Sequence, residues 1–202
     1  MEELHPDIKK IIFSKETLQN RIKELAAQIS KDYEGLDLAI VCVMKGAAFF
    51  TIDLIKYLTI PATVDFITVS SYGSNTVSSG IVKLLKDVDI DLHNKHVLVT
   101  EDILDTGQTL SYLIKHLNNK KPASIKICAL LNKPHRRKFE IPLAYSGFII
   151  SDVFIVGYGM DYDHRYRDLA YMGELKPEIY QEPFNNDCKK NPKSKEKVLV
   201  LT

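Results

Sequence analysis

The sequence predicts an α/β protein whose core is a twisted, mostly parallel β-sheet flanked by helices. Apolar runs of strand length alternate with segments in which apolar residues recur every three or four positions. Strands that are apolar at nearly every position are typical of a sheet covered on both faces. With 202 residues, 45% of them hydrophobic, the chain is long enough for one domain with a sizeable core. We expect that domain to span residues 1–182 and residues 183–202 to form a polar, mobile tail.

The first half of the chain begins with an amphipathic helix. Ser14 is a candidate N-cap, and the helical pattern ends near Gly35. The apolar residues of this helix are Leu18, Ile22, Leu25, Ile29 and Tyr33. A buried strand over residues 38–44 follows, then a helix over residues 47–58 and a strand rich in β-branched residues over residues 62–70.

The second half resumes the alternation after a segment that has neither period. Residues 71–80 are rich in Gly and Ser, which predicts either disorder or a working lid. A strand over residues 81–85, a buried strand over residues 97–99, a helix over residues 108–117 and a strand over residues 124–131 follow. Strands that alternate with helices imply right-handed crossovers and hence a parallel sheet.

Charge and cysteine usage limit the classes of function. A net charge of +1 gives no general reason to expect nucleic acid or an acidic membrane as a partner. The N-terminus lacks the basic-then-apolar order of a signal peptide, and no apolar run is long enough to span a bilayer. Cys42 and Cys128 lie in apolar runs, which predicts reduced core thiols, whereas Cys188 lies in the polar tail. We therefore expect a cytoplasmic protein.

The most informative segment is the end of the 97–99 strand and the turn after it. Glu101 and Asp102 follow the strand, and in open α/β sheets ligands bind beyond the carboxyl ends of strands. Asp105 then opens a Thr/Gly/Thr turn, where successive N–H groups and two hydroxyls can bind a phosphate at a helix N-terminus. Gly107 would allow close approach to the phosphate, because a Cβ there would fill the cradle. The alternative is an ordinary strand–turn–helix junction in which a turn side chain caps the helix.

This acidic turn resembles the phosphoribosyl-diphosphate motif of the type I phosphoribosyltransferases. Five further motifs occur in the order seen in the hypoxanthine-guanine branch of that family, at residues 43–46, 70–73, 131–134, 153–158 and 161–169. The resemblance covers roughly residues 8 to 180. The first motif alone indicates the superfamily, whereas the set of six indicates the branch that acts on 6-oxopurines.

The resemblance implies a fold, a reaction and an assembly. The fold is that of the type I phosphoribosyltransferases, with a small hood built from the termini and residues 139–182. The reaction is the Mg²⁺-dependent transfer of ribose 5-phosphate from phosphoribosyl diphosphate to hypoxanthine, and also to guanine. Its products are IMP or GMP and diphosphate, as in purine salvage. The assembly is a homodimer or homotetramer, with the Lys45 region near the subunit interface.

The resemblance also assigns the acidic turn to the sugar and its phosphate. Glu101 and Asp102 would serve the ribose hydroxyls and Mg²⁺, one carboxylate directly and the other by supporting it. Asp105 would be the general acid/base that exchanges a proton with the imidazole ring of the purine. The 5-phosphate would be bound by Asp105, Thr106, Gly107, Gln108 and Thr109.

The diphosphate would be bound by Lys45, Gly46 and Arg167. In the family the Lys-Gly pair contains an unusual cis peptide bond that frees N–H groups for the leaving group, and the sequence leaves the isomer open here. Arg167 would bind the diphosphate through its planar guanidinium group. Asp161, six residues earlier, would hold Mg²⁺ directly or through water. Without this context, Lys45 is an ordinary surface lysine.

Four residues resemble the purine side of the family's site: Lys133, Phe154, Ile155 and Asp161. Phe154 would stack on the purine ring, and Lys133 would donate a hydrogen bond to the 6-oxo oxygen. The backbone of Ile155 would recognise the opposite edge of the ring. A charged donor at that oxygen discriminates against adenine, whose amino group there is itself a donor. On local sequence alone, Phe154 is an ordinary core residue.

Ser71 and Tyr72, with the Gly/Ser segment after them, resemble the catalytic lid of the family. Bond formation at the anomeric carbon passes through a cationic, oxocarbenium-like state that water could intercept. A lid that closes over the ligands excludes water, and its Gly/Ser content gives it the freedom to close.

Two other functions stay open at this point. One keeps the fold but transfers ribose 5-phosphate to another base, such as xanthine or a pyrimidine. The other is a nucleotide-sensing regulator that binds nucleic acid. Only the Lys-rich stretch 189–197 favours the regulator, and the near-neutral charge of the chain argues against it.

Overall fold

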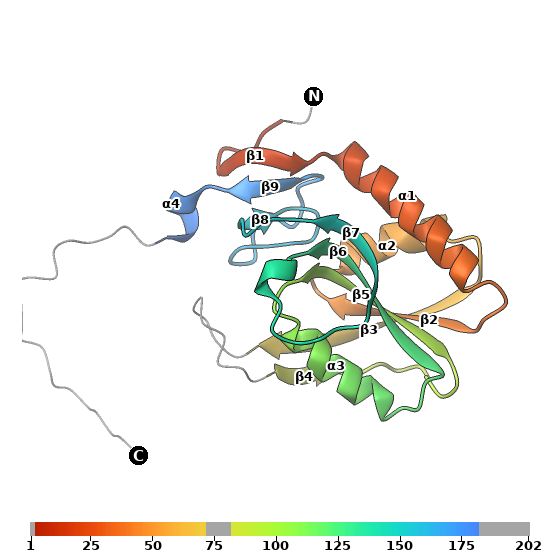
Figure 1. Ribbon diagram of the computed structural model, residues 1–202. Coiled ribbons are helices and arrows are strands. Elements are labelled where there is room, and N and C mark those ends of the chain that lie inside the picture. The colour runs from red at the N-terminus through yellow and green to blue at the C-terminus, as the bar shows by residue number, and fades with distance from the viewer. Residues whose placement is uncertain (1–2, 72–81, 182–202) are drawn as a thin grey trace, which may run out of the picture.

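Six strands form the main sheet of the computed structural model, which describes residues 3–71 and 82–181 (Figure 1). In spatial order they are β4 (Val82–Lys86), β3 (Ala62–Ser71), β2 (Leu38–Met44), β5 (His96–Leu104), β6 (Ser124–Asn132) and β7 (Leu143–Ile149). All neighbouring pairs are parallel except β3 and β4. The predicted mostly parallel sheet is therefore confirmed.

The chain reverses its direction of travel across the sheet at β2. From β2 it moves outward to β3 and β4, and it then returns to the other side of β2 to form β5, β6 and β7. The carboxyl ends of β2 and β5 thus lie side by side at the topological switch point. In open α/β sheets this is the place where ligands bind.

Helices cover both faces of the main sheet. The helices α1 (Lys15–Asp32) and α2 (Ala48–Tyr57) pack on one face, and α3 (Gln108–Asn118) packs on the other. The side chains of β2 alternate accordingly: Leu38 and Ile40 join the core beneath α1 and α2, whereas Ala39 and Val41 join the core beneath α3. Burial on both faces explains why this strand is apolar throughout.

The helix α1 follows the sequence prediction closely. Ser14 is its N-cap, and the Ser14 side-chain oxygen accepts a hydrogen bond of 3.2 Å from the Thr17 N–H. The apolar face predicted from the spacing is buried: Leu18, Ile22, Leu25, Ile29 and Tyr33 are each at most 2% exposed. This helix anchors the hood to the main sheet, because the first strand of the hood directly precedes it.

The hood is a separate antiparallel sheet in the order β1 (Ile8–Phe13), β9 (Met172–Leu175) and β8 (Ile155–Val156), with α4 (Pro177–Tyr180) after it. It unites the N-terminal segment with residues 155–175, as the resemblance implied. One part of the expectation was wrong: residues 143–149 belong to the main sheet as β7, where they pair with β6. This apolar segment pairs in parallel with the edge of β6 that β5 leaves free, and the chain continues to the hood after it.

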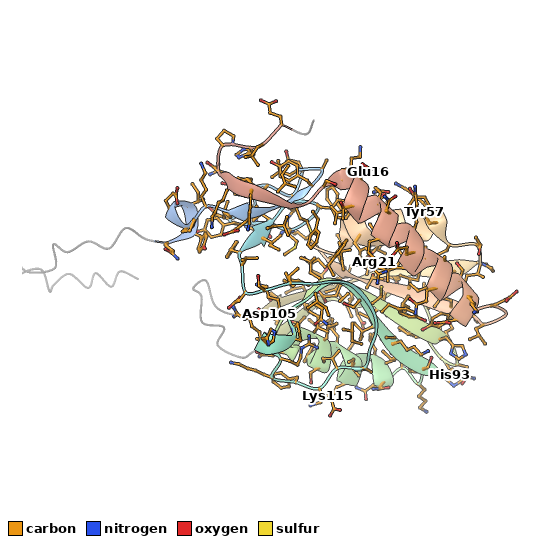
Figure 2. All side chains as sticks on the ribbon, turned by 45° about the horizontal axis from the view of Figure 1, so that its top comes forward. Glu16, Arg21, Tyr57, His93, Asp105 and Lys115 are labelled. Carbon is orange, nitrogen blue, oxygen red and sulfur yellow. The ribbon has the colours of Figure 1, made fainter. Side chains whose placement is uncertain are left out.

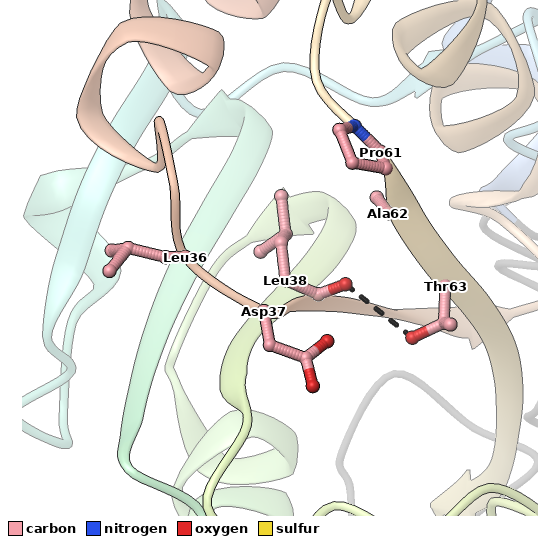
Figure 3. Close-up of a pocket in the computed structure, with 6 residues that line it drawn as sticks. All are labelled: Leu36, Asp37, Leu38, Pro61, Ala62 and Thr63. Carbon is pink, nitrogen blue, oxygen red and sulfur yellow. Dashed lines mark hydrogen bonds between the residues drawn. The ribbon is translucent and has the colours of Figure 1, made fainter.

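A small cavity of about 190 Å³ lies at the opposite end of the sheet from the carboxyl ends of the strands (Figure 3). Residues 36–38 and 61–63 line it, at the amino ends of β2 and β3. The Thr63 hydroxyl donates to the Leu38 carbonyl across it, at 3.4 Å. The cavity therefore lies away from the switch point.

Two sequence expectations concern the chain as a whole. Cys42 and Cys128 are buried free thiols, which confirms the prediction for the cysteines within the described residues. Cys188 lies outside these residues. In the part of the chain that the structure describes, no helix has the length and apolar character needed to cross a membrane.

Candidate active site

A step in the main sheet creates the candidate site. The pairing of β2 with β5 ends at Cys42 and Thr100, but β5 continues for four residues along β6 as far as Leu104, opposite Asn132. The expectation that the acidic residues follow the strand was therefore wrong, since Glu101 and Asp102 lie within β5. Pairing with β6 extends the strand, and one flank of its last residues faces the turn that follows β2.

That turn packs tightly against the two acids. A Cβ on Gly46 would lie 1.7 Å from Asp102 Oδ2, so only glycine allows the Asp102 carboxylate its position. The Met44–Lys45 peptide bond is cis, the isomer seen in the family's Lys-Gly loop. The Lys45 side chain is exposed at the rim of the site. The structure thus brings the predicted diphosphate turn and the predicted ribose acids into contact.

Burial governs the ionisation of the acidic pair. Glu101 is 9% exposed, and its Oε2 has no hydrogen-bond partner among the described residues. Loss of hydration raises the pKa of Glu101 well above its ordinary 4.5, and the charge of the neighbouring Asp102 raises it further. Burial also raises the pKa of Asp102, an effect that the charge of Arg167 opposes. Because these two carboxyl groups are poorly hydrated, binding of a cation or of a hydroxyl donor beside them is favourable.

These oxygens fit Mg²⁺, which prefers hard oxygen ligands and takes few of them from protein. The buried, unpartnered Oε2 of Glu101 is the kind of atom that such an ion or its water would satisfy. The third predicted metal ligand, Asp161, does not join this pair. In residues 3–71 and 82–181, no three His, Cys, Asp or Glu side chains gather closely enough to hold a metal by themselves. A metal here depends on oxygens of a bound ligand.

The turn after β5 has the form of an anion site. Gly107, in a left-handed conformation at φ +85°, is the N-cap of α3 and has no side chain of its own to cap the helix. The Thr106 hydroxyl accepts a 3.3 Å hydrogen bond from the first helical N–H, that of Gln108, as expected for a turn side chain that caps the helix. Thr106, Gln108 and Thr109 are all half-buried. A helix N-terminus with two threonines beside it also favours a phosphate.

The structure gives two reasons for glycine at position 107. The first is its positive φ, which side-chain-bearing residues rarely adopt. The second is the packing of the turn, since a Cβ there would lie 3.0 Å from Ile141 Cγ1, 3.1 Å from the Phe139 carbonyl oxygen and 3.2 Å from Arg137 Cδ. The predicted close approach to a phosphate stays a prediction.

The back of the turn is held by a residue that sequence analysis missed. The Arg137 guanidinium donates to the carbonyls of Leu104 at 3.3 Å and Asp105 at 3.1 Å, and to Asn132 Oδ1 at 2.6 Å. The Thr106 carbonyl accepts N–H donors from residues 138 and 139. Because its carbonyl oxygens are bound on the side of residues 137–139, the turn can direct its N–H groups to the opposite side. The run of basic residues at 136–138, just beyond a strand end, was the available signal.

Lys133 and Phe154 are connected through Val153, and we refer to these two residues as the Lys133–Phe154 wall. Lys133 is 8% exposed, and its Nζ donates to the Val153 carbonyl at 2.8 Å and to Asp152 Oδ1 at 3.2 Å. Half-buried Phe154 stacks on Tyr180, with ring centroids 4.7 Å apart, and meets the edge of Tyr162 at 5.6 Å. Tyr162 lies in the predicted motif at residues 161–169 but was given no role there. Tyr180 was missed, because α4 begins 23 residues after Phe154.

The backbone of Ile155 is oriented away from its partner strand. Ile155 lies opposite Glu174, and the Leu175 N–H donates to the Phe154 carbonyl at 2.9 Å. This register makes Ile155 and Glu174 a non-hydrogen-bonded pair, whose own N–H and C=O groups point outward. Because β8 is an edge strand, these groups face away from the hood sheet. A flat ligand on Phe154 can therefore meet main-chain donors and acceptors.

The loop between β8 and β9 rests on the Lys45–Gly46 turn. A Cβ on Gly159 would lie 2.4 Å from the Gly46 carbonyl oxygen. Arg167 donates to the Gly159 carbonyl, and its Nη2 lies 2.6 Å from Asp161 Oδ1. Asp161 Oδ2 also accepts a 2.9 Å hydrogen bond from the backbone N–H of His164. The structure thus gathers Lys45, Gly46, Asp161 and Arg167 in one region.

The lid lies only partly within the described residues. Ser71 is the last residue of β3 and pairs with Val82 of β4, and Tyr72 lies outside the described residues. The strand after the lid is β4, one residue later than predicted. Figure 2 places Asp105 at the end of the sheet that faces the hood, with His93 at the other end.

The fold and a family comparison define the class of this protein as a phosphoribosyltransferase. The chain matches the phosphoribosyl transferase domain family over residues 10–163. It is 47% identical over 186 residues to the hypoxanthine-guanine phosphoribosyltransferase of Mycobacterium bovis, covering 89% of this chain and 92% of that protein. It is 48% identical over 179 residues to that of Streptococcus thermophilus, covering 89% and 99%.

Solved structures agree with these relatives. A crystal structure of a hypoxanthine phosphoribosyltransferase from Staphylococcus aureus is 46% identical and superposes with a TM-score of 0.84, covering 88% of this chain and 97% of that one. The chain therefore belongs to the hypoxanthine-guanine phosphoribosyltransferase family, and its fold is that of the type I phosphoribosyltransferases.

The raised pKa of Glu101 predicts how stability depends on pH. A carboxyl whose pKa is higher in the folded state than in the unfolded state makes the protein less stable as pH rises above the unfolded value of 4.5. Glu101→Gln has no such titration. We expect it to raise the free energy of unfolding of the ligand-free protein more at about pH 8 than at about pH 5, as measured by urea unfolding. If Glu101→Gln changed the free energy of unfolding by the same amount at both pH values, the raised pKa would be contradicted.

Proposed function

We propose that this protein transfers ribose 5-phosphate from phosphoribosyl diphosphate to hypoxanthine, and also to guanine, yielding IMP or GMP and diphosphate. The observation that carries the proposal is the placement of three parts at one end of the sheet. These parts are the acidic pair of buried Glu101 and half-buried Asp102, the turn that begins α3, and the Lys133–Phe154 wall. The names of the relatives support the 6-oxopurine as acceptor.

The acidic turn binds the sugar phosphate. The 5-phosphate takes the N-terminus of α3 and the N–H groups and hydroxyls of residues 105–109, and Glu101 and Asp102 accept from the ribose hydroxyls. The uncharged Gln108 leaves the phosphate mainly to N–H and hydroxyl donors. Fixing both ends of the ribose orients its anomeric carbon toward the base, which lowers the entropy loss of reaching the transition state.

Glu101 and Asp102 would hold Mg²⁺ together with oxygens of the ligand, and Asp161, beside Arg167, would be a further metal ligand. When bound there, Mg²⁺ would supply positive charge to neutralise the departing diphosphate. On the protein side, Arg167, Lys45 and the backbone N–H groups of the Lys45–Gly46 turn bind the same leaving group.

The chemical step forms one bond and breaks another. A purine ring nitrogen bonds to the anomeric carbon while the bond from that carbon to diphosphate breaks, and the diphosphate departs with the bonding electrons. The purine then carries one proton too many on its imidazole ring. Asp105, half-buried where the acidic turn meets the wall, accepts that proton as general base.

The wall selects the base. An ammonium group has three N–H donors, of which Lys133 uses two for Val153 and Asp152, so one is left for the 6-oxo oxygen. Phe154, backed by Tyr180, supports the flat ring, and the outward backbone groups of Ile155 meet its edge. Adenine would place an amino group against the Lys133 ammonium, which would pair two donors.

The proposal also includes a lid over the site, a cytoplasmic location and an oligomeric assembly. Ser71 and Tyr72 belong to a lid that excludes water during the reaction. The protein acts in the cytoplasm as a homodimer or homotetramer. Two large apolar side chains of α2, Phe49 and Ile52, are 43% and 44% exposed close to the Lys45 turn, which supports a subunit interface there.

Asp105→Asn tests the proton transfer. We expect kcat to fall at least tenfold, because an amide cannot accept the purine proton, while IMP still binds. Steady-state kinetics and calorimetric titration with IMP measure the two quantities. The matched control is Asp91→Asn, an exposed acid near the other end of the sheet, which should keep wild-type kcat. Wild-type turnover in Asp105→Asn would remove Asp105 from the role of base.

Base selection is tested by a product assay with hypoxanthine, guanine, xanthine and adenine. The wild-type protein should use hypoxanthine and guanine and reject adenine. Lys133→Ala should lower the ratio of kcat/KM for hypoxanthine to that for adenine at least tenfold, because the charged donor to the 6-oxo oxygen is gone. The control Lys115→Ala alters an exposed lysine of α3 and should keep the ratio. An unchanged ratio in Lys133→Ala would overturn the assignment, and turnover of a different base alone would overturn the acceptor.

A further inference from the structure

Arg136 lies between two carboxylates beside the candidate site. Its Nε is 2.9 Å from Asp105 Oδ1, an ion pair in which the N–H is not aligned for a hydrogen bond. Its Nη1 is 2.9 Å from Asp152 Oδ1 and 3.2 Å from Asp152 Oδ2. Asp152 Oδ1 is also 3.2 Å from Lys133 Nζ. A chain of charges of alternating sign therefore joins the proposed base, Asp105, to the lysine of the purine wall.

The backbone around Arg136 is fixed. Pro134–Arg136 forms the short 3₁₀ helix η1 directly after β6, in which the Arg136 N–H donates to the Lys133 carbonyl at 3.2 Å. The next residue, Arg137, binds the main-chain carbonyl of Asp105 at 3.1 Å. Two consecutive arginines thus hold Asp105, Arg137 through the main chain and Arg136 through the carboxylate.

Stability alone gives a weak reason for this arrangement. The side chains of Arg136 and Asp152 are 45% and 61% exposed, and that of Asp105 is 37% exposed. Ion pairs with this much contact with water contribute little to folding, because water screens them and two long side chains lose freedom. The geometry is better suited to setting the position of one carboxylate, that of Asp105.

We propose that Arg136, itself oriented by Asp152, is a positioning residue that keeps the Asp105 carboxylate directed at the purine ring. The inference rests on the proposed role of Asp105 as the base. A proton can pass from the imidazole ring to Asp105 only when a carboxylate oxygen lies within hydrogen-bond reach of it, so the orientation of this side chain matters for the rate. The guanidinium of Arg136 restricts that orientation. Its planar fork reaches two carboxylates at once, whereas a lysine presents a single point charge.

A double-mutant cycle on the full chain tests the inference. The measured quantity is the single-turnover rate of IMP formation from saturating hypoxanthine and phosphoribosyl diphosphate, which reports the chemical step. We expect Arg136→Gln to lower this rate about tenfold while the KM for phosphoribosyl diphosphate changes less than twofold. In the Asp105→Asn background, the same substitution should change the rate less than twofold, because Arg136 acts through Asp105.

Two further variants separate charge, geometry and folding. Arg136→Lys keeps the charge without the fork and should recover only part of the lost rate. Lys115→Gln removes a positive charge from an exposed position on α3 and should keep the wild-type rate, and thermal unfolding of each variant reports on folding. An equal loss from Arg136→Gln with and without Asp105, or no loss at all, would overturn the inference alone. A wild-type rate in Asp105→Asn would overturn the proposed base and this inference with it.

Discussion

The contact between Gly46 and Asp102 is the constraint on which the rest of the site depends. The turn after β2 closes over the last residues of β5 so tightly that a single added carbon would overlap the carboxylate. The same closeness removes Glu101 and Asp102 from water and raises the pKa of both. A buried acidic pair destabilises the ligand-free protein and favours any ligand that brings a cation or hydroxyl donors to it. Binding and stability are therefore opposed at this position.

The hood extends this constraint to the other half of the site. Gly159 rests on the Gly46 carbonyl, and Arg167 bonds to Gly159 while its charge acts on Asp102. A displacement of the Lys45–Gly46 turn would consequently move the acidic pair and the Arg167 loop together. The Tyr158 hydroxyl, which donates to Asp53 Oδ2 of α2 at 2.6 Å, ties the same loop to the helix that follows the turn. The leaving-group side of the site is thus one packed unit, although its two segments lie more than 100 positions apart in the chain.

Local sequence was enough to predict most elements of the fold, because each depends on short-range periodicity, whereas the residues of the candidate site were assigned by the resemblance to a family. The bounds of β2 and the Ser14 cap are examples. Features that depend on distant partners were missed or misjudged. The strand β5 extends past Glu101 only because β6 supplies Asn132 opposite Leu104. Gly107 is required by packing against residues 137–141, and Tyr180 reaches Phe154 from the far side of the hood. Arg136 and Arg137 acquire their roles only when β6 returns beside β5.

The central claim is that the acidic turn binds the sugar phosphate while the Lys133–Phe154 wall binds the base. The most direct measurement is a crystal structure of the protein with IMP. We expect the 5-phosphate against the N-terminus of α3 at residues 105–109, the ribose hydroxyls toward Glu101 and Asp102, and the 6-oxo oxygen within hydrogen-bond distance of Lys133 Nζ. A nucleotide bound elsewhere, with the turn at residues 105–109 unoccupied, would contradict the account.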